Sequence, residues 1–268
     1  VRHLVKPAVA GVVLQDFCAL GTALAIYRIG LGLFRRDVAV ALAMLSVFFP
    51  FFHANGGADY HNTIAAPLFF LTGACVVAWA ERPRWIVAIA AGLAAASTLH
   101  TSPLFIMAGP CLAISGVVVA RQSGRTPRDI RALAGWALVG VAVTHAAFTA
   151  WHAALGRDWA FFLPQYRYIE SMREDPSRNI WWEPLSWRWM KDSSANGFML
   201  AVALISVAEG ARLLVGHLNA RRARGHAAIH LGWVAVYIWA VAYQLLHQTT
   251  LHPDYLGHLF NACTLLPL

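Results

Sequence analysis

The chain has 268 residues, of which 59% are hydrophobic and only 13% are charged, and its mean hydropathy is +0.54. Soluble domains carry about a quarter charged residues, so this composition excludes an ordinary soluble domain and indicates a membrane protein. The formal net charge of +8 does not indicate a nucleic-acid partner, because a basic soluble domain would not contain this much apolar sequence. The four cysteines lie far apart with no CxxC or Cys/His spacing, which argues against a zinc site or a disulfide framework.

Nine apolar segments are predicted to span a membrane. A helix rises 1.5 Å per residue, so about 20 residues cross a hydrocarbon core of about 30 Å. We therefore predict an all-α fold: a single polytopic transmembrane domain of eight or nine helices over residues 1–268. Its long polar segment, 156–194, is predicted to be an outer loop. The predicted spans are 5–27, 38–52, 64–80, 85–99, 104–120, 132–155, 198–215, 229–246 and 255–268.

The short connections between these spans differ in charge. If the N-terminus lies outside, successive connections alternate between the two sides of the membrane. The basic connections then all lie on one side, which the positive-inside rule assigns to the cytoplasm. The opposite, non-cytoplasmic face then holds the segments 53–62, 100–103, 156–194 and 247–254. The basic connections contain Arg28, Arg35, Arg36, Arg82, Arg84, Arg121, Arg125, Arg128, Arg131, Arg221, Arg222 and Arg224.

The polar turn HANGGADYH, residues 53–61, interrupts the apolar first third of the chain. Within it, Asp59 can act as a general base, orient an acceptor hydroxyl, or bind a divalent cation together with a pyrophosphate. His61 can donate a hydrogen bond to a phosphate oxygen or hold Asp59 in place. The alternative is structural: Asp59 or Asn62 caps the helix that begins near Thr63. Both interpretations stay open.

Three further polar residues are candidates for substrate binding. Asp16 lies roughly three turns into the first span, where an ionised carboxylate is costly unless it is paired or hydrated. His100 ends the fourth span at the outer face, and His252 lies in the polar turn LHPDY. The alternative places Asp16 at the interface, if the span starts later, and makes the two histidines boundary residues.

The predicted outer loop is rich in tryptophan and cationic residues. Such side chains suit the lipid headgroup region, so part of the loop is predicted to form an amphipathic interfacial helix. The same residues could cover a polyprenyl-phosphate donor, because arginine suits phosphate and aromatic faces suit sugars. The two interpretations are compatible. The substrate-binding candidates in the loop are Arg167, Arg178, Trp181, Trp182 and Lys191.

The segment from residue 19 to about 119 resembles the GT-C integral-membrane glycosyltransferases, most closely the bacterial members related to protein O-mannosyltransferases and lipid A aminoarabinose transferases. The resemblance lies in RIGLGLFRRDVAVALAMLSVFFPFF, in DYHNTIAAPLFFLTGACVVAW and in ERPRWIVAIAAGLAAASTLHTSPLFI. These proteins similarly show an Arg-rich cytoplasmic turn, a span ending in proline and aromatic residues, a polar outer turn, and a span rich in alanine and glycine.

The resemblance implies a transferase of the bacterial inner membrane that moves a sugar from a polyprenyl-phosphate donor to a lipid, glycan or protein acceptor on the non-cytoplasmic face. The resemblance does not imply a particular cofactor, although a divalent metal is a candidate. The family's essential acidic motif lies in the first outer loop, and no such loop precedes Val5. If the first span here corresponds to the family's second, we expect that motif upstream, with Asp59 in a supporting role. The alternatives are a transporter subunit and a non-catalytic membrane protein.

Overall fold

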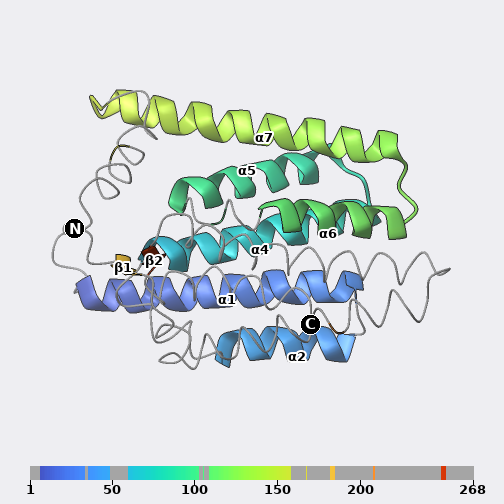
Figure 1. Cartoon of the computed structure of the whole chain (residues 1–268), viewed down its shortest axis with the longest axis horizontal. Helices are drawn as coiled ribbons and strands as arrows, with labels where there is room; N and C mark the ends of the chain where they lie inside the picture. Colours follow the sequence, from blue (N-terminus) through green and yellow to red (C-terminus); the bar gives the residue numbers. More distant parts are fainter. Residues whose placement is uncertain are drawn as a thin grey trace.

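The computed structural model describes residues 7–33, 36–48, 60–102, 105, 109–157, 167, 182–184, 208 and 249–251. Apart from two three-residue strands, these residues form helices (Figure 1). The helical fold class is therefore confirmed for this part of the chain. The elements are α1 (Pro7–Leu33), α2 (Arg36–Phe48), α4 (Tyr60–Glu81), α5 (Trp85–Thr101), α6 (Gly109–Gln122), α7 (Pro127–Ala154), β1 (Trp182–Pro184) and β2 (Thr249–Leu251).

Three of the described helices are long and apolar enough to cross a membrane. They contain the segments Gly11–Gly32, Ile64–Glu81 and Pro127–Ala154. Helices α5 and α6 are apolar but shorter. These lengths support the prediction of a membrane protein.

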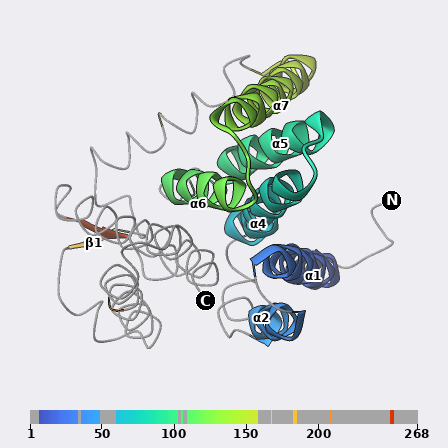
Figure 2. The same cartoon turned by 90° about the vertical axis from the view of Figure 1, so that its right-hand side faces the viewer.

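The helices lie roughly along one axis and alternate in direction (Figure 1). Across the bundle α7 packs on α5, α5 on α4, α4 on α1, and α1 on α2, while α6 packs on α4 (Figure 2). One end of the bundle, named here the arginine end, holds the end of α4 and the starts of α5 and α7. The opposite end, named the histidine end, holds the start of α4 and the ends of α5 and α7.

Several helix boundaries differ from the predicted spans. Helix α1 continues past residue 27 to Leu33, and within this extension Arg28 pairs with Glu81 of α4: its Nη1 and Nη2 donate to Oε1 and Oε2 at 3.1 and 2.6 Å. Helix α7 starts at Pro127 rather than 132, because the Thr126 hydroxyl and the Asp129 carboxylate form a capping box around its first turn. Helix α6 is described from Gly109, and most of the first residues of the predicted span 104–120 lie outside the described residues. The predictions followed hydrophobicity, which does not register caps or ion pairs.

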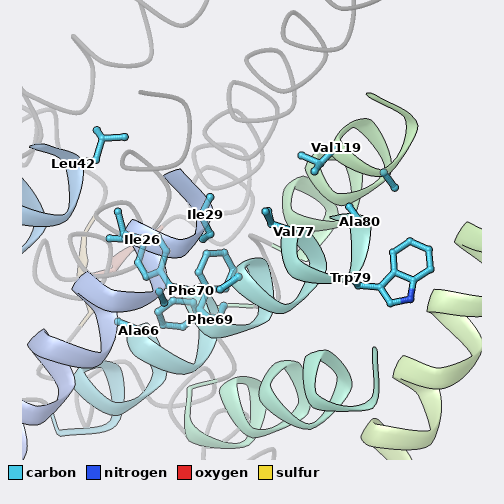
Figure 3. Close-up of a cluster of buried hydrophobic side chains, with 14 of the residues drawn as sticks. Ile26, Ile29, Leu42, Ala66, Phe69, Phe70, Val77, Trp79, Ala80 and Val119 are labelled. Atoms are coloured by element: carbon cyan, nitrogen blue, oxygen red, sulfur yellow. The ribbon is translucent and has the colours of Figure 1, made fainter. Parts of the chain in front are cut away.

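The packing places small residues inside and large apolar residues outside. Most of the buried hydrophobic residues are alanines, joined by an aromatic group in which the Phe69 ring lies 5.6 Å from Phe70 and 5.3 Å from Phe105 (Figure 3). The outward residues include Phe17, Leu138 and Trp151, each about two-thirds exposed (68%, 66% and 66%). Small residues at helix contacts and large apolar residues outside are typical of helices that face lipid.

Buried hydroxyl groups are satisfied within their own helices. Thr22, Thr72, Thr98 and Thr144 each donate to the carbonyl oxygen four residues earlier, at 2.8 to 3.1 Å. An unsatisfied hydroxyl would be costly in an apolar environment. These threonines therefore fit a lipid-surrounded bundle without forming a polar path.

The arginine end is held together by a cation from the α6–α7 connection. Gly124, at φ 78°, ends the turn after α6 in the left-handed region that favours glycine. The next residue, Arg125, donates from Nε to the Ala80 carbonyl at 2.8 Å and from Nη2 to the Glu81 carbonyl at 2.7 Å. These are carbonyls at the end of α4 that have no partner within the helix. Arg125 thus ties the start of α7 to the end of α4.

Candidate functional site

The candidate site lies where α5 and α7 approach most closely. At the point of closest approach each helix contributes a buried glycine, Gly92 in α5 and Gly140 in α7. An added Cβ at Gly92 would overlap the Ala137 carbonyl oxygen, and one at Gly140 would overlap the Ile89 carbonyl oxygen. Only glycine allows this approach, which is typical of small-residue helix contacts in membranes. Toward the histidine end, the same approach brings larger side chains of the two helices together.

His100 of α5 meets two rings of α7 at the histidine end. The ring centroids of His100 and His145 are 4.7 Å apart, with the planes at 88°, so the edge of one ring faces the other. The Phe148 centroid lies 4.8 Å from that of His100. His100 is partly buried with its Nε2 atom fully enclosed, whereas His145 is exposed. The pair therefore presents one sheltered and one accessible imidazole.

The surroundings of His100 favour its neutral form. His100 lies just after the predicted span 85–99. Burial is the main cause that lowers the pKa of His100 below its ordinary value, and the charge of nearby His145 is the second. Neutral imidazole can accept a hydrogen bond or a proton from a ligand. This cluster is therefore suited to orienting a hydroxyl or exchanging a proton.

The lowered pKa of His100 predicts a loss of stability in acid. Because the folded pKa lies below the unfolded value of about 6.5, the unfolded chain binds more protons as the pH falls through that value. We expect the melting temperature in detergent to fall more between pH 7.5 and 5.5 for the wild type than for His100→Gln. Other titrating groups are common to both proteins and cancel in the comparison. Equal pH dependence would contradict this assignment.

The HANGGADYH turn leads into the histidine end. Helix α4 begins at Tyr60, directly after Asp59, and its first turn includes His61. Asn62 therefore lies inside the helix, so the prediction that it precedes the helix as a cap is wrong. Asp59 lies outside the described residues, and whether it caps α4 stays open. The hairpin of α4 and α5 places the start of α4 and His100 at the same end of the bundle (Figure 1).

Asp16 is separated from this cluster. It is exposed on α1, and α4 lies between α1 and α5 in the bundle (Figure 2). Within the described part of the chain, Asp16 forms no salt bridge. The structure therefore does not join Asp16 to His100.

The outer-loop candidates are described only in part. Arg167 is helical and exposed, and Trp182 begins β1. The predicted site residues Arg178, Trp181, Lys191 and His252 lie outside the described residues. Strand β1 pairs with β2 in antiparallel register, Trp182 opposite Leu251, which joins the predicted outer loop to the 247–254 turn. Figure 1 shows both strands at the same end of the long axis as the start of α4.

The α7 part of the cluster was missed by the sequence analysis. His145, Phe148 and His152 stand at spacings of three and four residues in THAAFTAWH, which places them on one side of a helix. That spacing inside an apolar span was the available signal. The spacing does not say which neighbouring helix these three side chains face.

No family model, curated protein or solved structure matches the chain. Among the described residues, no group of three or more His, Cys, Asp or Glu side chains could hold a metal ion. Any functional assignment therefore rests on the distribution and chemistry of the residues themselves.

Proposed function

We propose that the chain is a multi-pass membrane glycosyltransferase with a GT-C-like bundle of eight or nine spans, located in a bacterial inner membrane. It would transfer a sugar from a polyprenyl-phosphate donor to a lipid, glycan or protein acceptor on the non-cytoplasmic face. Membrane lipids would be its other partners, and nucleic acid has no place in this function.

One observation carries the proposal: residues suited to acid–base and phosphate chemistry gather at the end of the bundle opposite the arginines. The start of α4, which follows Asp59, lies at this end together with His100 and His145. The described part of the arginine end carries eight arginines and three acidic residues, as expected of a cytoplasmic face. A transporter would instead need charged groups along a path through the membrane, and the buried hydroxyls of these helices bond internally.

The proposed chemistry divides between the acid and the imidazoles. Transfer requires removal of a proton from the acceptor hydroxyl as it attacks the sugar carbon, while the phosphate leaves with the bonding electrons. Asp59 would orient or deprotonate the hydroxyl, and His61 would donate to a phosphate oxygen. His100, held neutral beside His145, would position the acceptor. The cationic and aromatic residues of the outer loop, Arg178 and Trp181 among them, would cover the donor.

The proposal is tested by the variant Asp59→Asn in the full-length protein. The carboxamide keeps the size of the side chain but cannot take a proton, so we expect transfer to fall on the order of 100-fold. Membrane insertion should stay unchanged. Transfer would be measured in membrane vesicles with a panel of radiolabelled polyprenyl-phosphate hexoses and pentoses, and insertion by the amount of protein in the membrane fraction.

Asp37→Asn is the matched control. Asp37 lies in the first turn of α2, at the arginine end, so the same chemical change there should leave transfer intact. Unchanged turnover in Asp59→Asn would reduce Asp59 to a helix cap. The absence of transfer from every donor in the wild-type protein would overturn the proposed function itself.

A further inference from the structure

The arginine end has more positive charge than its own acidic residues can balance. Among the residues that the structure describes, eight arginines and three acidic residues lie there, a net charge of +5. Glu81 pairs with Arg28 at 2.6 Å, and Asp129 accepts hydrogen bonds from the backbone N–H and hydroxyl of Thr126 at 2.8 and 2.7 Å. The third, Asp37, is on α2, away from α5 and α7. Asp129 also interacts with the charges of Arg125 and Arg128, and the net positive charge that remains beside α5 and α7 favours an external anion.

Two tryptophans sit beside this charge. Trp85, the first residue of α5, and Trp136 of α7 have ring centroids 5.7 Å apart at a tilt of 43°. They remain 55% and 44% exposed, although they contact each other. Tryptophan at the edge of an apolar helix is typical of the membrane interface, where the ring meets lipid carbonyls and glycerol.

On both α5 and α7 an arginine lies nearer the end of the bundle than the tryptophan does. Arg84 directly precedes Trp85 and occupies the N-cap position of α5, where its side chain makes no capping bond. Arg128 precedes Trp136 by eight residues, which is about 12 Å along α7 and about 80° around its axis. Arg84 and Arg128 are both exposed. Arg84 thus lies next to its tryptophan and Arg128 about 12 Å outside its own, so both cations are nearer the arginine end than the rings are.

We propose that the arginine end of α5 and α7 binds the headgroup of an anionic phospholipid. Arg84 and Arg128 contact its phosphate, and the Trp85–Trp136 pair lies against its glycerol and upper acyl chains. Basic pockets between membrane helices on the cytoplasmic side suit such headgroups. The site is at the opposite end from His100, and the inference requires no transferase activity.

The test compares ligands on the full chain purified in detergent. Binding of short-chain phosphatidylglycerol, short-chain phosphatidylcholine and inorganic phosphate would be measured by microscale thermophoresis. Each arginine near a lipid surface contributes about 1 kcal/mol, or about five-fold in affinity. Phosphatidylcholine carries the same phosphate, but its choline cation leaves it with no net charge, so we expect phosphatidylglycerol to bind up to about 25-fold more tightly. Inorganic phosphate, which lacks the acyl chains, should compete poorly.

Matched variants distinguish binding at a specific site from general attraction of the lipid to the positive charge of this end of the bundle. Arg84→Gln with Arg128→Gln should abolish the preference for phosphatidylglycerol, whereas Arg121→Gln, the same change on α6, should keep it. Trp136→Leu should weaken binding of phosphatidylglycerol while the protein stays monodisperse. The proposal is overturned if the two lipids bind equally, if Arg121→Gln loses as much preference as the double variant, or if inorganic phosphate displaces the lipid at equal concentration.

Discussion

Gly140→Leu is expected to lower the stability of the helical bundle by about 3 kcal/mol. Overpacking a filled contact costs about 1–3 kcal/mol, and here the added atoms meet the backbone of α5, at the Ile89 carbonyl and the Leu93 amide, rather than a movable side chain. Helix α7 must therefore shift away from α5. The free energy of unfolding, followed by chemical denaturation in detergent, should fall accordingly, and the contact between His100 and His145 should be lost.

Gly135→Leu on the same helix is the control for this prediction. A Cβ at Gly135 would meet no atom within 4 Å, and leucine favours a helix over glycine by roughly 1 kcal/mol. The Gly135 variant should thus be as stable as the wild type or more so. Equal effects of the two substitutions would show that the close approach at Gly140 does not hold the bundle together.

Arg125→Gln is expected to cost about 2 kcal/mol by releasing the start of α7 from the end of α4. The guanidinium donates to two carbonyls, those of Ala80 and Glu81, and a hydrogen bond from a charged donor contributes about 1.5–3 kcal/mol. Partial exposure of Arg125 keeps the expected total near the lower end of that range. Thermal unfolding in detergent should show a lower midpoint than in the wild type.

The control for this second prediction is Arg131→Gln, which removes the same charge from an exposed position of α7. Its stability should match that of the wild type, because surface charges contribute little. A similar loss in both variants would attribute the effect to net charge rather than to the two hydrogen bonds.

Helix positions followed well from the sequence, and helix ends less well. The apolar run at 64–80 falls within α4, and that at 132–155 falls within α7 but for its last residue, because a helix that faces lipid must be apolar over its whole buried length. The ends depend on single side chains. Thr126 and Asp129 cap α7 before its apolar part, and α1 continues past its predicted end through Arg28, which pairs with Glu81.

The candidate site was predictable only in part. His100 was identified because a histidine ends an apolar span, and His61 because it follows Asp59 in a polar turn. His145 was not identified, because the role of a histidine inside an apolar helix cannot be inferred until the helix that it faces is known. The contact with His100 depends on the close approach at Gly92 and Gly140, which is defined only once α5 and α7 are packed together.

The sequence by itself indicated a helical membrane protein and a concentration of arginines in alternate connections, because hydrophobicity and charge act through composition and local order. Only the tertiary structure decided that α5 packs on α7, that Arg125 ties α7 to α4, and that Asp16 lies apart from His100. Which helices become neighbours depends on the fit of small residues between surfaces far apart in the chain, and hydrophobicity does not encode that fit.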